Sequence, residues 1–188
     1  MLELKNVSFS YGELKVLDNF NLDVKKGECV CLWGKSGCGK TTALRIIMGL
    51  EKADSGLCLT PQKISCVFQE DRLINGLTLE KNIKLPLKRE QYKKADMLID
   101  KFGLAEFKNT RVSELSGGMK RRATIIRALS FEGDLLILDE AFNGIDAKMK
   151  EKIARVIKEE FLDNNKSVIL VSHISSDAEL LGARIIKM

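Results

Sequence analysis

The sequence is poor in the residues that build zinc sites and disulfide frameworks. Its 188 residues include one histidine and five cysteines, and no two cysteines form a Cys-x-x-Cys pair. An odd number of cysteines with a single histidine argues against both kinds of structure. Cys29 and Cys31 alternate on one face of an apolar segment, where a thiol behaves as a small hydrophobic side chain. We therefore expect reduced, structural cysteines in a cytosolic protein.

Long apolar runs and basic tracts are also missing. No run approaches the ~20 apolar residues that a membrane-spanning helix needs, so any work at a membrane would require a partner that sits in it. The formal net charge of +5 is mild, and no basic tract is interleaved with aromatic side chains, so no nucleic-acid partner is expected. With 45% hydrophobic and 30% charged residues, the composition is that of a soluble globular domain.

What is present is an alternation of strand and helix patterns. Such alternation predicts an α/β fold with a mostly parallel sheet and helices on both faces. The periodicities predict strands over 2–9, 20–24, 28–33, 57–59, 64–68, 135–139, 167–172 and 184–187, and helices over 40–48, 118–130 and around 153–161.

Residues 69–115 have a different character. Their pattern is helical, with Ala95, Leu98 and Ile99 on one face and Gly103 as a terminator. We expect an inserted helical subdomain over 69–115, within a single domain of residues 1–188 whose core is formed by 1–68 and 116–188.

A phosphate-binding motif follows the buried strand at 28–33. Residues Gly34-Lys35-Ser36-Gly37-Cys38-Gly39-Lys40-Thr41, with Thr42 next, fit the pattern G-x-x-x-x-G-K-[ST]. The glycines let backbone N–H groups converge on phosphates at a helix N-terminus, Lys40 adds a point charge, and the Thr41 hydroxyl is suited to Mg²⁺. This motif predicts a magnesium–nucleoside triphosphate site.

An acidic strand end is the natural partner of that loop. The apolar run Leu135-Leu136-Ile137-Leu138 leads into Asp139 and Glu140. A parallel strand delivers these carboxylates to the edge where the phosphate loop lies. There Asp139 can hold magnesium and Glu140 can polarise an attacking water, which points to hydrolysis.

The segment Leu115-Ser116-Gly117-Gly118-Met119 resembles the LSGGQ signature of ABC-type ATPases, with Met119 where that family most often has Gln. Ser116 can cap the following helix, and Gly117 and Gly118 expose N–H groups that form a second anion-binding surface. The resemblance extends over essentially the whole chain, and it implies a P-loop NTPase fold with a RecA-like core and an N-terminal antiparallel β part. It departs from the family pattern at Ala141, where proline is usual, and at Ile174, where Asp often follows the histidine.

The resemblance implies roles for four more residues. Tyr11 corresponds to the aromatic that stacks on adenine, although it is also compatible with an ordinary edge tyrosine. Gln69 corresponds to the glutamine that touches magnesium and water and relays to a membrane partner, or is a solvated strand end. Asp146 resembles the acidic residue of the loop that crosses to the other subunit, and can be a helix cap as well. His173 matches the switch histidine that contacts the γ-phosphate, or is an ordinary surface or core histidine.

The function implied by the resemblance is that of an ABC transporter ATPase. Its cofactors would be ATP and Mg²⁺, hydrolysed in a head-to-tail dimer with a second copy or a paired ABC ATPase subunit. ATP on Lys40 and Thr41 would be closed over by Ser116 and Gly118 of the partner subunit. The chain would be cytoplasmic and held at the inner face of the cell membrane by transmembrane permease subunits. A non-transport ABC ATPase and a regulatory nucleotide-binding module are the alternatives. The intact Glu140 and His173 argue against the regulatory module.

The amino-acid sequence of segment 64–83 is similar to that of the ATPases of nitrate/sulfonate/taurine-type importers, and also to that of other small ABC ATPases that pair with separate membrane subunits. Leu73, Ile74, Leu77 and Leu79 are apolar residues near an expected rim. One interpretation is that they line a groove for a coupling helix of the membrane subunit. The other is that they pack the core of the helical subdomain itself.

Overall fold

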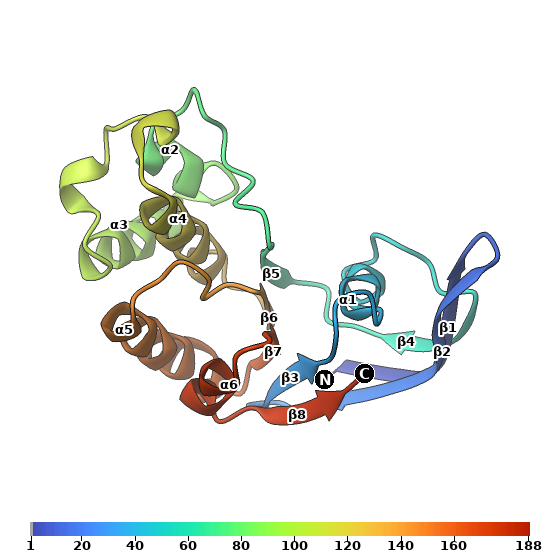
Figure 1. The fold of residues 1–188 in the computed structure, drawn as a ribbon. Helices are drawn as coiled ribbons and strands as arrows, with labels where there is room; N and C mark the ends of the chain where they lie inside the picture. The colour runs from blue at the N-terminus through green and yellow to red at the C-terminus, as the bar shows by residue number, and fades with distance from the viewer. Residues whose placement is uncertain (1) are drawn as a thin grey trace.

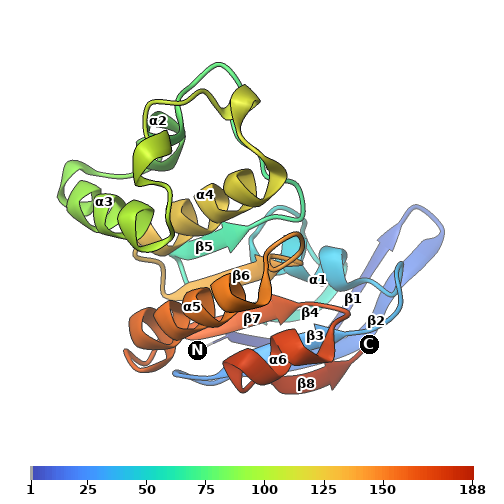
Figure 2. The ribbon, with the colours of Figure 1, turned by 60° about the vertical axis from the view of Figure 1, so that its left-hand side comes forward.

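A five-stranded parallel sheet forms the centre of the molecule. The computed structural model describes residues 2–188. The strand order is β5-β6-β7-β3-β8, and all five strands point the same way, as Figure 2 shows. The strands are β3 (Cys29–Trp33), β5 (Ile64–Val67), β6 (Leu135–Asp139), β7 (Ser167–Val171) and β8 (Arg184–Lys187). The predicted parallel sheet is confirmed.

A second, antiparallel sheet contains the N-terminal strands. Its order is β2-β1-β4, formed by β1 (Leu2–Tyr11), β2 (Leu14–Val24) and β4 (Ser55–Leu59). Leu4 pairs with Leu22 and Val7 pairs with Phe20, which places the apolar residues of both strands on one face. The N-terminal antiparallel part implied by the family resemblance is confirmed.

Two hydrophobic cores lie on opposite faces of the parallel sheet. Side chains alternate along β3, so Cys29 and Cys31 join one core while Val30 and Leu32 join the other. The first core holds α4 (Gly117–Ser130), α5 (Ala147–Ile157) and α6 (Ser175–Leu181) against the sheet, and the second holds α1 (Lys40–Ile47) and the antiparallel sheet. Helices therefore cover both faces, as predicted. All five cysteines are free.

The helical insert lies beside the sheet edge formed by β5 (Figure 1). It contains α2 (Leu79–Lys84), α3 (Tyr92–Lys101) and short 3-10 turns at Arg89–Gln91, Ala105–Phe107 and Val112–Glu114. Helix α4 contacts α2, α3 and β5, so it joins the insert to the sheet. The subdomain limits at 69 and 115 stay a prediction. None of the helices within residues 2–188 is both long and apolar enough to cross a membrane.

The apolar residues at the start of this insert do not form one groove. Leu79 is fully buried in the core, and Leu73 packs against the same core. Ile74 is 50% exposed, so only it lies well out in solvent. The prediction that all four leucine and isoleucine side chains line a groove is therefore wrong. The cause is Asn82, whose buried amide bonds both the N–H and the C=O of Ile74 at 2.7 and 3.0 Å and pins this segment against α2.

Candidate nucleotide-binding and hydrolysis site

The functional side chains meet at the carboxyl edge of the parallel sheet. The phosphate loop follows β3, Gln69 follows β5, Asp139 ends β6 and His173 follows β7. Because parallel strands present their carboxyl ends at one edge, residues far apart in sequence converge there. A cavity of about 470 Å³ at this edge is lined by Val16, Gly34, Ser36, Gly37, Gly39, Lys40, Thr41, Thr42, Gln69, Asp139, Glu140, Val171 and His173.

The phosphate loop requires glycine at two positions for steric reasons. A Cβ at Gly34 would lie 2.6 Å from Cys38 Sγ and 2.9 Å from the backbone oxygen of Met188. Gly39, at φ 99°, starts helix α1, and its Cβ would lie 3.0 Å from the backbone oxygen of Val16. The loop is therefore a close-packed turn whose N–H groups stay open at the helix N-terminus.

Lys40 lies across this loop. Its Nζ donates hydrogen bonds to the backbone oxygens of Gly34 and Lys35, both at 2.8 Å. The ammonium group is therefore held at the mouth of the turn, next to the N–H groups. A positive charge and a helix N-terminus at one point favour a phosphate group.

Asp139 supplies a buried carboxylate to the same cavity. Burial, followed by the neighbouring Glu140 carboxylate, raises the pKa of Asp139 above its ordinary value. A cation at this position would relieve both effects. The Asp139 carboxylate, the Thr41 hydroxyl and the Gln69 amide all offer oxygen ligands, which are the ligands that Mg²⁺ takes together with phosphate oxygens. The residues present therefore fit a magnesium–triphosphate group.

Glu140 is held in an unusual backbone conformation. Its φ is 48°, in the left-handed region that residues other than glycine rarely adopt. Its N–H donates to the oxygen of Val171 at 2.9 Å, and its carboxylate accepts from the Asn143 side chain at 2.9 Å. The other carboxylate oxygen lies 3.7 Å from Nδ1 of His173. Strain of this kind persists only where the surrounding structure enforces it, and it is typical of functional sites.

Several predicted site residues lie outside this cavity. Lys35 and Cys38 belong to the loop but do not contribute to the cavity lining. Tyr11 ends β1, is 44% exposed and contacts Phe9 edge-on at 4.8 Å between ring centroids.

The signature residues are also outside the cavity of their own chain. Ser116 caps α4 by accepting from the Met119 N–H at 3.3 Å, and Asp146 caps α5 by accepting from the Met149 N–H at 3.0 Å. Gly118 lies against the Gly144 carbonyl, where a Cβ would approach to 3.2 Å. Both caps agree with the capping roles expected from the sequence.

Sequence reasoning missed two cavity residues and one contact of the site. Val16 and Val171 line the cavity, and Asn143 bonds the Glu140 carboxylate. The valines look like ordinary strand residues in the sequence, so nothing marked them. Asn143 lies three residues after Glu140, and that spacing in a turn was the available signal.

Comparison with known proteins identifies the family. Residues 17–143, which include the phosphate loop, the signature segment and Glu140, match the family model described as "ABC transporter". The chain belongs to the ABC transporter family. It is an ATPase of that family, and it hydrolyses ATP to ADP and phosphate.

Individual relatives agree with this assignment. The ABC cassette is 38% identical to the aliphatic sulfonates import ATP-binding protein of Pseudomonas syringae pv. syringae, over 98% of its own length and 68% of that protein. It is also 38% identical to the spermidine/putrescine import ATP-binding protein of Spiroplasma citri, over 100% of its own length and 59% of that protein. A dimeric ATP-binding cassette solved in a post-hydrolysis state with ADP and phosphate superposes with a TM-score of 0.86 at 32% identity, covering 100% of this chain and 94% of that one.

Proposed function

We propose that this chain is the ATP-hydrolysing subunit of an ABC importer, that it works as a head-to-tail dimer, and that it is bound to separate transmembrane permease subunits. The observation that carries the proposal is the single cavity that unites the phosphate loop with Gln69, Asp139, Glu140 and His173. Each neighbouring parallel strand contributes one part of that chemistry. The protein would be cytoplasmic and held at the inner membrane face by the permease.

In this proposal the loop from Gly34 to Thr42 holds the phosphates. Lys40 would exchange its bonds to the two loop carbonyls for bonds to phosphate oxygens, which carry more negative charge. Thr41, Gln69 and Asp139 would hold Mg²⁺, and Tyr11 would stack on the adenine. Magnesium would neutralise charge that develops on the phosphates during hydrolysis.

Glu140 is the proposed general base. Asn143 fixes one of its carboxylate oxygens, while the other faces His173 and stays free to accept a proton from water. The side chain of His173 is 63% exposed, and His173 lines the same cavity as the phosphate loop. We assign His173 to the γ-phosphate and Glu140 to the attacking water.

The site of one chain is half of a working site in this proposal. Ser116, Gly117 and Gly118 form the open N-terminus of α4, yet they do not line the cavity of their own chain. A head-to-tail partner would bring this N-terminus onto the phosphates, where its N–H groups complement negative charge. Gly144, in the loop that leads to Asp146, adjoins Gly118, so this loop would lie in the same interface.

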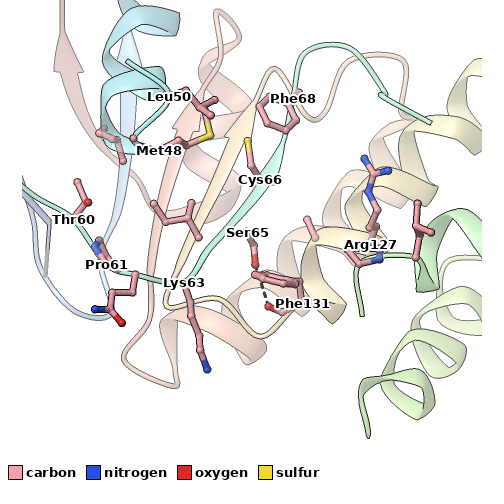
Figure 3. A pocket seen from close by; sticks show the side chains of 17 residues that line it. Met48, Leu50, Thr60, Pro61, Lys63, Ser65, Cys66, Phe68, Arg127 and Phe131 are labelled. Carbon is pink, nitrogen blue, oxygen red and sulfur yellow. Dashed lines mark hydrogen bonds between the residues drawn. The ribbon is translucent and has the colours of Figure 1, made fainter. Parts of the chain in front are cut away.

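A second cavity is the proposed permease groove. It has a volume of about 620 Å³ and lies between the end of α1, strand β5 and helix α4 (Figure 3). Met48, Leu50, Phe68 and Phe131 give it apolar walls, with Arg127 at one side. A mostly apolar groove with two charged residues, Arg127 and Lys63, suits an amphipathic helix. This groove replaces the one predicted around Leu73 to Leu79.

The imported substrate does not follow from this chain. Two relatives of equal identity carry names for sulfonates and for polyamines, which have opposite charges. In the proposal, the membrane and binding subunits choose the cargo and this chain supplies the energy of ATP.

Replacing Glu140 by glutamine tests the proposal. Glu140→Gln keeps the size and the hydrogen bond to Asn143 but removes the base. ATP affinity should stay unchanged while phosphate release falls by about a hundredfold or more, the usual contribution of a general base. An ATP-loaded dimer should then accumulate on size-exclusion chromatography. Glu151→Gln, an exposed carboxylate on α5, is the matched control. Normal turnover by Glu140→Gln would mean that another group is the base.

A further inference from the structure

Arg121 is a buried arginine on the signature helix with an unusual set of partners. It is 5% exposed and lies on α4, the helix that begins at the signature segment. Its side chain donates to the backbone oxygens of Phe68, Gln69, Asp139, Glu140 and Ala141 at 2.6, 3.2, 2.9, 2.6 and 2.9 Å. Asp71 lies 3.4 Å away and provides the counter-charge. A buried guanidinium is tolerated when its donors are satisfied in this way.

The partners of Arg121 fall into two groups, at the carboxyl ends of the neighbouring strands β5 and β6. Phe68 and Gln69 form the loop that follows β5. Asp139, Glu140 and Ala141 form the end of β6, which continues into the turn that carries the proposed base. One planar side chain therefore connects the backbone of Gln69, the proposed ligand of magnesium and water, to the backbone of Asp139 and Glu140, the proposed metal ligand and general base. No other contact of α4 reaches both segments among the hydrogen bonds of residues 2–188.

The contact with Glu140 falls on a strained residue. Glu140 adopts a φ of 48°, and its carbonyl accepts from Arg121 at 2.6 Å while its N–H is bonded to Val171. Both backbone polar groups of Glu140 are thus held by hydrogen bonds. Strained backbone of this kind relaxes when the contacts that enforce it are removed. Without Arg121, the Glu140 carboxylate would lose its fixed direction.

We propose that Arg121 is a positioning residue for hydrolysis: it holds Gln69 and Glu140 in register with each other and ties both to the signature helix. This inference rests on the proposed roles of Gln69 and Glu140. Arg121 touches neither nucleotide nor water in it and acts through those two residues. Ser116 caps the N-terminus of α4. In the proposed dimer, the phosphate that binds at this N-terminus belongs to the partner's nucleotide. Its binding would therefore also stabilise the hydrolytic geometry in the nucleotide cavity of this chain.

The test compares Arg121→Gln, Arg121→Lys and a control, Thr124→Ala, in the full chain. Thr124 is as buried as Arg121 on the same helix, but its hydroxyl bonds only the carbonyl of Arg121. The measurements are kcat and KM for magnesium-ATP from phosphate release, ATP affinity in EDTA, and thermal unfolding. The Tm values separate loss of stability from loss of positioning.

Arg121→Gln should lower kcat by about tenfold or more with KM and ATP affinity within about threefold, because one amide cannot reach both segments. Arg121→Lys should recover part of kcat, since an ammonium keeps the charge and up to three donors. Thr124→Ala should lower Tm and leave kcat within about twofold. Equal kcat losses in Arg121→Gln and Thr124→Ala, or a kcat loss that follows Tm across the three variants, would overturn the positioning role. If Arg121→Gln does not fold, the comparison of Arg121→Lys with Thr124→Ala decides.

A second comparison separates this inference from the proposed function. If Arg121→Gln turns over ATP at the wild-type rate while Glu140→Gln does not, Arg121 has no positioning role and Glu140 is still supported as the base. Normal turnover in Glu140→Gln would remove the base itself. In single-turnover reactions, adding Arg121→Gln to Glu140→Gln should change the residual rate by less than about threefold, since both act on the same step. A further loss of about tenfold would mean that Arg121 does not work through Glu140.

Discussion

At the scale of single residues, Lys40 carries the positive charge that faces the cavity from the phosphate loop. Its Nζ bonds two loop carbonyls and stands beside the open N–H groups of α1. We expect Lys40→Ala to weaken ATP binding roughly a hundredfold, because a charge-assisted contact to phosphate is lost. Titration with a fluorescent ATP analogue measures the Kd. Lys35→Ala, a loop residue outside the cavity lining, is the comparison. Equal affinities in the two variants would contradict this expectation.

Asp139 illustrates a conflict between stability and function. Burial raises the pKa of Asp139 in the folded protein. The contribution of this carboxyl to folding stability is therefore fully present below the pKa that it has in the unfolded chain. That contribution is lost as the pH rises through the pKa of the folded state. At neutral pH the ionised carboxylate therefore costs stability when no cation is bound. Asp139→Asn should raise Tm by about 2–4 °C in EDTA and stop hydrolysis. The gain should shrink as the pH is lowered below about 4, where the parent carboxyl is protonated in both states. Thermal unfolding at pH 7 and pH 4 checks both statements, and a lower Tm for Asp139→Asn at pH 7 would contradict them.

At the scale of secondary-structure elements, an ion pair between a buried carboxylate and a partly buried lysine joins α5 to α6. Asp177 is 1% exposed and accepts from Lys150 Nζ and from Ser172 Oγ, both at 2.9 Å. Ser172 immediately precedes His173. Lys150→Met should destabilise the fold by about 3 kcal/mol, because the buried carboxylate loses its counter-charge. Lys152→Met, an exposed position on the same helix, should change stability by less than about 0.5 kcal/mol. Urea unfolding measures both, and similar values for the two would show that the pair is not the cause.

Elements with strong local signals could be predicted from the sequence. The apolar run ending in Asp139 predicts β6, and Gly39 and Gly49 bracket α1, whose last turn closes at Gly49 with φ 69°. The pattern missed α6, because seven residues from Ser175 to Leu181 are too few to show a helical period.

The site was predictable to the extent that topology determines it. The order of the motifs along a parallel sheet requires the phosphate loop, Gln69, Asp139 and His173 to share one edge. The contacts of Arg121 were not predictable, because its partners lie up to 53 residues away in sequence and are backbone carbonyls that any residue provides. The placement of the segment before α2 depends in the same way on the buried amide of Asn82, which donates to the backbone oxygens of Ile74, Leu77 and Thr78.

At the scale of the whole molecule, the two cavities separate two proposed tasks. The nucleotide cavity lies at the carboxyl edge of the sheet, and the groove of Figure 3 lies between the end of α1 and the helical insert. Coupling would then pass through α1 and the Phe68–Gln69 segment, which border both cavities.

Leu50 tests the groove. It is 56% exposed and lines that cavity, whereas Met97 is 63% exposed on α3 and does not. Leu50→Glu should reduce co-purification with the permease subunits from membranes by about tenfold, because a charge would enter an apolar contact. Met97→Glu should co-purify normally, and circular dichroism checks that both variants fold. Full assembly of Leu50→Glu would exclude the groove as the docking site.

The left-handed backbone of Glu140 has a consequence for anyone who engineers this chain. Glycine at this position would release the strain, and asparagine at Asp139 would remove a buried charge. Both substitutions would rank well in a library selected for heat resistance, and both would yield an inert protein. A selection on thermostability alone would therefore enrich sequences that no longer consume ATP, and turnover has to be assayed in every round.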